Sequence, residues 1–165
     1  RDAAALDWAR LRDLSEDELA ELDRPAGTYH VKAARLKALV AALWKDHDGS
    51  LERMLAGPLP EARGRLLAVR GIGPETADAI LLYAGGRPTF VIDAYTRRIL
   101  RRHLLIGGSE SYAEVQALFR ESLPSDPVVY NEYHALLVEL AKRHCRSRAD
   151  CAGCPLADLP HDESL

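Results

Sequence analysis

A pair of glycines near the middle of the chain is the feature that most constrains the fold. Gly71-Ile72-Gly73 lies between an apolar segment that ends at Val69 and a second one that begins after Pro74. Proline suits the first position of a helix, because its missing N–H would have no helical partner there. The second segment repeats its apolar residues at helical spacing: Ala77, Ile80, Leu81 and Ala84. We therefore predict helix, tight turn, helix, with N–H groups after the turn that can bind an anion such as a phosphate.

Asp93 separates the apolar run Phe90-Val91-Ile92 from a basic segment that begins at Tyr95. A carboxylate at the start of a helix commonly caps it by accepting a backbone N–H bond. A carboxylate can also act in catalysis, where it stabilises positive charge or orients an attacking water. The two roles are compatible, and the residues around Asp93 leave both open.

The other segments read as helices joined by loops that contain glycine and proline. Ser15 and Glu18 form a capping-box pattern at the start of one helix. Apolar residues predict an amphipathic helix over about 30–45, and further helices over 95–104, over 112–123 and from about 129 into the cysteine-containing tail. No strand pattern is longer than 89–92. The predicted fold class is therefore all-α.

Charge is distributed unevenly over the 165 residues. The net charge of −3 at pH 7 argues against a nucleic-acid partner, because such proteins usually present a basic face. Positive residues nevertheless gather in two blocks, 97–103 and 142–148. One block alone is explained as a solvated helix face. Two blocks that bracket a candidate site favour contact with a DNA backbone.

Cysteine usage and hydropathy limit where such a chain can work. All three cysteines lie within the last 21 residues, which indicates a metal or cluster site rather than a disulfide framework. No run of 18 apolar residues predicts a membrane span, and no signal peptide is visible. We therefore expect a cytoplasmic protein with no membrane partner.

Two motifs in this order resemble those of a known family. The pattern Val69-x-Gly71-Ile72-Gly73-x-x-Thr76-Ala77, followed by Val91-Ile92-Asp93, resembles the helix–hairpin–helix and Gly/Pro-Asp signature of the endonuclease III superfamily of DNA glycosylases. The tail Cys145…Cys151-Ala152-Gly153-Cys154-Pro155-Leu156 resembles the iron–sulfur loop of the same superfamily. The resemblance implies two helical lobes with a cleft between them. We expect 1–88 to hold the helix–hairpin–helix motif, 89–165 to hold Asp93 and the cysteine loop, and the family's further N-terminal helices to be missing.

The resemblance also implies roles for single residues. Asp93 matches the catalytic carboxylate of the family, and the backbone of Gly71 and Gly73 matches the site that holds a DNA phosphate. Further DNA contacts are implied at Thr28, Tyr29, Thr76 and Arg97, of which the first two match a loop that reaches into the duplex. A plain turn between helices is the alternative explanation for the glycines.

Glu75 departs from the strand-cleaving members of the family, which carry a lysine at this position. That lysine attacks the sugar and then cleaves the strand, whereas a glutamate cannot form a Schiff base. The departure implies a monofunctional glycosylase that uses water as its nucleophile. The structural alternative is that Glu75 complements the dipole of the helix it helps to begin.

The cysteine tail matches three of the four cluster ligands of the family. The family pattern is Cys-x6-Cys-x2-Cys-x5-Cys, whereas here Cys145, Cys151 and Cys154 have a shorter first gap and Pro160 stands at the fourth position. A 4Fe–4S cluster then needs another fourth ligand, such as Asp158 or His161. A Zn²⁺ held by the three cysteines with His144 or His161 is also chemically sound. The third alternative is a loop that binds nothing.

The resemblance is closest to the branch of the superfamily that removes alkylated purines such as 3-methyladenine. Those bases are already cationic, so they leave without a strong general acid. It implies a monomeric, nucleoid-associated enzyme of base-excision repair whose partner is double-stranded DNA with a damaged base. His134 and Glu132 can line the base pocket, or be merely buried or solvated. The alternatives are an endonuclease III-like glycosylase for oxidised pyrimidines and a non-catalytic DNA-binding module of the same fold.

Overall fold

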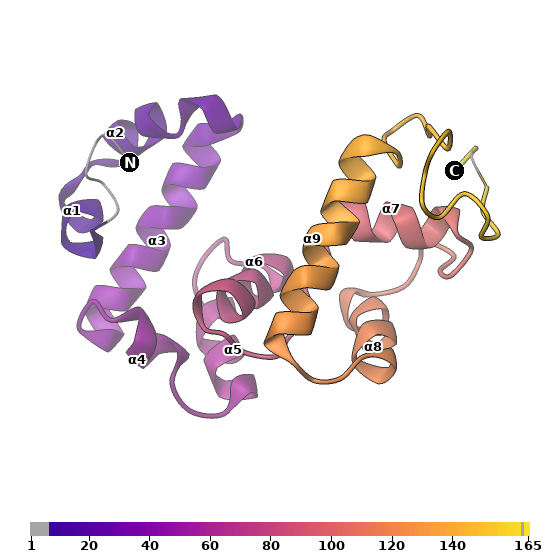
Figure 1. Ribbon diagram of the computed structural model, residues 1–165. Helices are drawn as coiled ribbons and strands as arrows, with labels where there is room; N and C mark the ends of the chain where they lie inside the picture. Colours follow the sequence, from indigo (N-terminus) through magenta and orange to yellow (C-terminus); the bar gives the residue numbers. More distant parts are fainter. Residues whose placement is uncertain (1–6, 163) are drawn as a thin grey trace. The chain divides into compact units, whose positions relative to one another are not determined.

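The computed structural model describes residues 7–162 and 164–165. Their regular structure is helical without any strand, which confirms the all-α prediction (Figure 1). The helices are α1 (Trp8–Asp13), α2 (Glu16–Leu22), α3 (Tyr29–His47), α4 (Leu51–Leu55), α5 (Leu59–Leu67), α6 (Pro74–Ala79), α7 (Ala94–Arg102), α8 (Tyr112–Ser122) and α9 (Pro127–Arg143). A 3₁₀ turn, η1 (Arg24–Ala26), and a π-helical turn, η2 (Ile80–Ala84), complete the order.

Side-chain caps explain where several helices begin. Ser15 accepts the Glu18 backbone N–H at 3.2 Å, and the Glu18 carboxylate accepts the Ser15 backbone N–H at 2.7 Å, which confirms the capping box before α2. α9 begins earlier than the apolar pattern suggested. Its start is set by Asp126, which accepts the Val128 N–H at 2.8 Å, and by Pro127 at the first helical position.

Contacts divide the chain into two compact units, Arg1–Ala77 and Asp78–Leu165. The division lies within α6, whereas the two lobes implied by the sequence resemblance meet after residue 88. Each unit contains its own buried apolar cluster.

The first unit is built around α3, against which α1, α2 and α4 pack (Figure 1). Lys37 of α3 ties α1 in place, because Nζ donates to the carbonyls of Arg12 at 2.7 Å and Leu14 at 2.6 Å. These carbonyls lie at the end of α1, where no helical N–H reaches them. The buried cluster consists of Leu11, Leu19, Ala20, Ala33 and Val40.

The second unit packs α7, α8 and α9 around the buried segment 90–92. Phe90 stacks on Phe119 of α8 with ring centroids 3.9 Å apart, and it meets Tyr130 of α9 edge-on at 5.4 Å. α9 also packs against α7 and η2. Since three consecutive side chains before Asp93 are buried, the backbone that leads into α7 is firmly held.

A buried polar network also anchors this segment. The fully buried carboxylate of Asp78 accepts hydrogen bonds from Thr89 Oγ1 at 3.1 Å and from Gln116 Nε2 at 2.9 Å. Gln116 Nε2 also donates to the Phe90 carbonyl at 2.6 Å. A buried polar group that loses its partner destabilises a protein by about 1–3 kcal/mol. The network therefore fixes the chain three residues before Asp93.

The helix after the glycine turn ends in a wider turn than the periodicity predicted. The Gly85 N–H donates to the Ile80 carbonyl, five residues earlier, at 3.1 Å. This π-type turn replaces the α-helical register that was expected through Ala84, and such turns are frequent at functional sites. Tyr83 lies within the turn and is 49% exposed.

Candidate active site

Asp93 caps α7, as the capping interpretation predicted. Its Oδ1 accepts the Thr96 backbone N–H at 2.7 Å, and its own backbone is extended, with φ −104° and ψ 180°. The side chain is only 14% exposed. One carboxylate oxygen is thus used for the cap, and Oδ2 is left for another interaction.

His134 of α9 faces that second oxygen. Its Nε2 lies 3.6 Å from Asp93 Oδ2, which is an ion-pair distance but longer than a hydrogen bond. Across the ring, Nδ1 lies 2.5 Å from the hydroxyl of Tyr83 in η2. Among the described residues Nε2 has no hydrogen-bond partner, although the side chain is buried. Tyr83, His134 and Asp93 therefore form a row of three polar side chains that ends at Oδ2.

The surroundings of Asp93 favour its charged form. Burial on its own would raise the pKa of Asp93, but the contact with His134 and the N–H of Thr96 outweigh it and hold the pKa below its ordinary value. The carboxylate is therefore ionised at neutral pH. Burial, together with the negative charge of Asp93, raises the pKa of Tyr83, so the phenol keeps its proton.

The glycine turn has the predicted form, and its two glycines differ. Gly71 has a φ of +86°, and a Cβ there would lie 2.6 Å from Arg35 Cγ. Gly73 has open space at the position of a Cβ, and its carbonyl accepts the Ala77 N–H at 2.9 Å. Chain geometry therefore explains Gly71, whereas packing does not explain Gly73. Gly71, Gly73, Glu75 and Thr76 are all exposed.

Thr28 and Tyr29 begin α3 in an uncommon backbone conformation. Thr28 is the N-cap residue with a φ of +39°, and its side chain makes no capping hydrogen bond. Thr28 is exposed, whereas Tyr29 packs against the apolar cluster of the first unit, 4.4 Å from the His30 ring. Tyr29 therefore has a packing role, and Thr28 is the solvent-exposed residue of the two.

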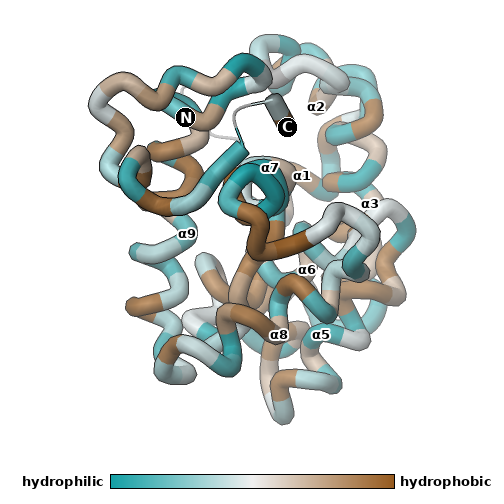
Figure 2. Tube along the Cα trace, turned by 90° about the vertical axis from the view of Figure 1, so that its right-hand side faces the viewer, coloured by the Kyte–Doolittle hydropathy of each residue, from teal (hydrophilic) through white to brown (hydrophobic). Residues whose placement is uncertain are grey.

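The basic residues 97–103 on and after α7 are only partly exposed to solvent. Arg102 is 4% exposed and donates to the Ser147 carbonyl at 2.8 Å, and Arg98 donates to the Cys145 carbonyl at 2.7 Å. Both side chains thus hold the C-terminal loop. The Arg101 side chain is exposed and makes no hydrogen bond or ion pair with the part of the chain that the structure describes. A hollow of about 360 Å³ is lined by Arg97, Arg98, Arg101, Arg102, Ile106, Gly108, Ser147 and Leu165, and Figure 2 shows α7 as largely hydrophilic.

The three cysteines line one small hollow beside α7. They are free thiols, and Arg102 Nη1 donates to Cys145 Sγ at 3.2 Å. The hollow is also lined by His103, His144 and His161. Asp158, a candidate fourth ligand, is exposed and does not line it.

His161 has the tautomer that suits a metal ligand. Its Nδ1 donates to the Leu159 carbonyl at 2.7 Å, which leaves the lone pair on Nε2. Within residues 7–162 and 164–165, no three His, Cys, Asp or Glu side chains gather as a site for one metal ion.

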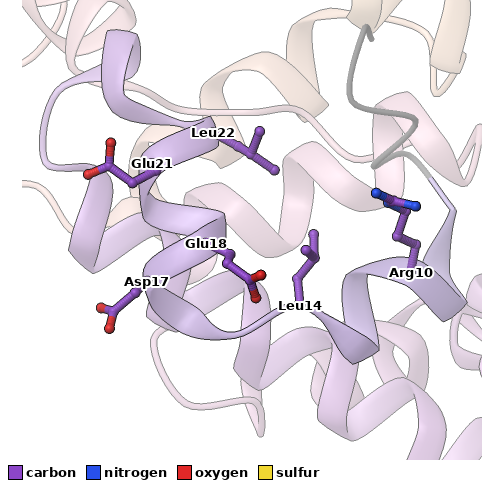
Figure 3. A pocket seen from close by; sticks show the side chains of 6 residues that line it. All are labelled: Arg10, Leu14, Asp17, Glu18, Glu21 and Leu22. Atoms are coloured by element: carbon purple, nitrogen blue, oxygen red, sulfur yellow. The ribbon is translucent and has the colours of Figure 1, made fainter.

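A hollow in the first unit has the opposite electrostatic character. Figure 3 shows Asp17, Glu18 and Glu21 of α2 along one side of it. Three carboxylates repel a phosphate backbone, whereas Arg10 also lines the hollow. Among the described helices, none is both long and apolar enough to cross a membrane.

Sequence reasoning missed Tyr83 and left His134 undecided. Tyr83 stands in a segment that the apolar periodicity assigned to an ordinary helix, and 51 residues separate it from His134. No local pattern marks such a pair. The one usable signal is the type of residue, since a histidine on the apolar side of α9 must find a partner when it is buried.

The sequence is similar to those of known DNA repair proteins. Residues 3–125 match the family model described as HhH-GPD superfamily base excision DNA repair protein. MJ1434 of Methanocaldococcus jannaschii, named as a candidate DNA repair glycosylase, is 41% identical over 156 residues, which cover 93% of this chain and 70% of the relative.

Two solved structures are similar to the chain. The H. pylori 3-methyladenine DNA glycosylase MagIII, bound to 1,N6-ethenoadenine, shares 30% identity with a TM-score of 0.66, over 82% of this chain and 67% of that protein. A non-covalent endonuclease III–DNA complex has a TM-score of 0.77 at 22% identity, over 96% and 70% of the two chains, which shows a shared fold. The chain thus spans about two thirds of the length of these proteins.

Proposed function

The chain belongs to the HhH-GPD superfamily of base excision DNA repair proteins, and from this premise we propose that it is a monofunctional DNA glycosylase. It hydrolyses the N-glycosidic bond of a damaged base in double-stranded DNA and leaves the strand intact. The observation that carries the proposal is the partly buried, ionised carboxylate of Asp93, with one oxygen in the cap of α7 and the other outside it.

The chemistry of glycosidic cleavage needs such a carboxylate. As the base leaves, positive charge builds on the sugar, and a nearby fixed negative charge stabilises it. The same oxygen can orient a water molecule for attack or accept its proton. Because the pKa of Asp93 lies below its ordinary value, the residue is in its active form at neutral pH.

We propose an alkylated purine such as 3-methyladenine as the base. A cationic base leaves without a strong general acid, and the acidic side chain in this row, Asp93, is itself ionised. The 30% identity to a 3-methyladenine DNA glycosylase supports this choice. Release of an oxidised pyrimidine instead of an alkylated purine would replace this choice of substrate.

Water is the proposed nucleophile because Glu75 cannot form a Schiff base with the sugar. Glu75 lies exposed in the first turn of α6, where its charge complements the helix dipole. No strand cleavage by β-elimination is therefore expected from this position.

Contacts with the DNA backbone are proposed at two places, one in each unit. The exposed turn of Gly71 and Gly73, with Thr76, offers backbone and hydroxyl groups to a phosphate. The arginine-lined hollow of α7, with Arg97 and the exposed Arg101, offers positive charge. Such contacts position the duplex without reading its sequence.

We propose that the cysteine loop holds a 4Fe–4S cluster with three cysteine ligands and one histidine. Cys145, Cys151, Cys154 and His161 line one hollow, and His161 carries its lone pair on Nε2. A bound cluster would supply a covalent anchor between the loop and its neighbours, and glycosidic cleavage does not need its redox chemistry. Iron content and the visible absorbance of the purified protein test this proposal, and their loss in His161→Ala but not in Asp158→Ala identifies the fourth ligand.

Incubation with duplexes that each carry one lesion tests the proposed function. The set contains 3-methyladenine, 7-methylguanine, thymine glycol and uracil, and each product is divided into samples with and without alkali. We expect release of an alkylated purine and strand breaks only after alkali. Strand breaks without alkali would contradict the role of water and Glu75, and release of thymine glycol alone would move the substrate to oxidised pyrimidines. Binding without any base release would support a non-catalytic DNA-binding module.

A further inference from the structure

Tyr83 and His134 are not part of the α7 cap, yet they form a row that ends at its carboxylate. They come from η2 and α9, which pack against each other, and α9 also packs against α7. His134 is 7% exposed, and its Nε2 has no hydrogen-bond partner among the described residues. An unpaired buried nitrogen destabilises a fold by about 1–3 kcal/mol. Because Nε2 lies 3.6 Å from Asp93 Oδ2, we infer that His134 acts on the carboxylate.

The hydroxyl of Tyr83 faces the Nδ1 nitrogen of His134. A neutral imidazole has one donor nitrogen and one acceptor nitrogen. The Tyr83 hydroxyl lies 2.5 Å from Nδ1, within reach of a hydrogen bond in which the phenol donates and the imidazole nitrogen accepts. In that arrangement the ring proton lies on Nε2, the nitrogen that faces Asp93 Oδ2.

We propose that Tyr83 and His134 are positioning residues for Asp93: the Tyr83 hydroxyl holds His134 as its Nε2–H tautomer, and that N–H orients Oδ2. The proposal rests on the glycosylase function proposed above. A neutral ring suits the reaction, because an imidazolium would cancel the negative charge that stabilises the cationic sugar. The distance of 3.6 Å exceeds a hydrogen bond by about half an ångström, and catalytic hydrogen bonds often tighten when the substrate binds.

The tautomer can be measured on the whole chain without DNA. Long-range ¹H–¹⁵N NMR of the histidine rings distinguishes a proton on Nε2 from one on Nδ1, and the His134 signals are assigned by their loss in His134→Gln. At neutral pH we expect a protonated Nε2 and a bare Nδ1, and loss of this preference in Tyr83→Phe. Tyr133→Phe is the matched control, because this α9 tyrosine touches Phe90 and makes no hydrogen bond to His134. A proton on Nδ1, or on both nitrogens, overturns the proposal.

Single-turnover base release tests the positioning role itself. Tyr83→Phe should slow release about two- to tenfold, the effect of one hydrogen bond, in a protein that is still folded at the assay temperature. His134→Gln, whose amide N–H reaches about as far as Nε2–H, should retain more activity than His134→Leu. Unchanged release in Tyr83→Phe, or equal loss in the two His134 variants, overturns the proposal. If the unaltered protein releases no base from any duplex, the glycosylase function fails, and the NMR result still decides the tautomer.

Discussion

Asp93 combines a structural role with a chemical one, and two substitutions separate them. Serine is as good a helix N-cap as aspartate but has no charge, whereas alanine provides neither. Asp93→Ser should therefore keep the hydrogen bond that the Thr96 N–H now makes to Oδ1 at 2.7 Å. Asp93→Ala should lose about 1 kcal/mol of stability, which lowers the unfolding temperature by about 2–4 °C in a chain of this size.

The chemical loss should be the same in both variants. A negative charge about 4 Å from the cationic sugar is worth about 4 kcal/mol at the effective dielectric constant of a partly buried site. The side chain of Asp93 is 14% exposed, so this value applies. Since 1.4 kcal/mol corresponds to a factor of ten, both variants should release base about 10³-fold more slowly.

Paired measurements of thermal unfolding and single-turnover base release check this expectation. Binding of lesion-containing duplex, followed by fluorescence anisotropy, is the control and should change little in Asp93→Ser. An Asp93→Ser protein with near-normal base release would refute the reasoning, because the cap alone would then explain the residue. Equal destabilisation by serine and alanine would instead remove the capping argument.

Three further predictions concern the turn, the buried network and pH. Gly71→Ala should destabilise the protein by about 1–2 kcal/mol, because of its φ of +86° and the close Arg35 side chain. Gly73→Ala should change the unfolding temperature by less than about 1 °C and weaken DNA binding. A larger loss of stability in Gly73→Ala than in Gly71→Ala would contradict the structural role given to Gly71. Gln116→Leu should lower the free energy of unfolding in urea by about 1–3 kcal/mol, since it removes a hydrogen-bond donor from the buried carboxylate of Asp78. An unchanged free energy of unfolding would show that the Asp78 network does not fix the segment before Asp93. Because the folded pKa of Asp93 is lowered, its contribution to stability is present above the ordinary carboxyl pKa of about 3.9 and lost as the pH falls through the folded value. The difference in unfolding free energy between the unaltered protein and Asp93→Ser should disappear below about pH 4. A difference that does not depend on pH would contradict the contacts of the Asp93 carboxylate with His134 and the Thr96 N–H.

The helices and the capping residues could be predicted from sequence because their causes are local. The helical spacing of the apolar residues predicted α3, α7, α8 and α9 within a few residues of their observed bounds. Ser15 and Asp93 cap the helices that follow them, since capping depends on residues only three positions apart.

The polar row at the site could not be predicted because its causes are not local. The π turn of η2 changes the register in which Tyr83 is presented, and a period of 3.6 residues cannot reveal it. Arg102 looked like one more member of a solvated basic block, yet it is buried. Its partners, such as the Ser147 carbonyl, lie more than 40 residues away. Charge patterns show which residues are ionised but not which of them the fold takes out of water.

Release of free 3-methyladenine from a duplex that carries one such base is the direct test of Asp93 as a catalytic carboxylate. The base is separated by chromatography after a single turnover with the unaltered protein and with Asp93→Asn. We predict release by the unaltered protein, about 10³-fold slower release by Asp93→Asn, and retained duplex binding by both. Equal release by the two proteins, or none from the unaltered protein that binds the duplex, would contradict the assignment of Asp93 as the catalytic carboxylate of a DNA glycosylase.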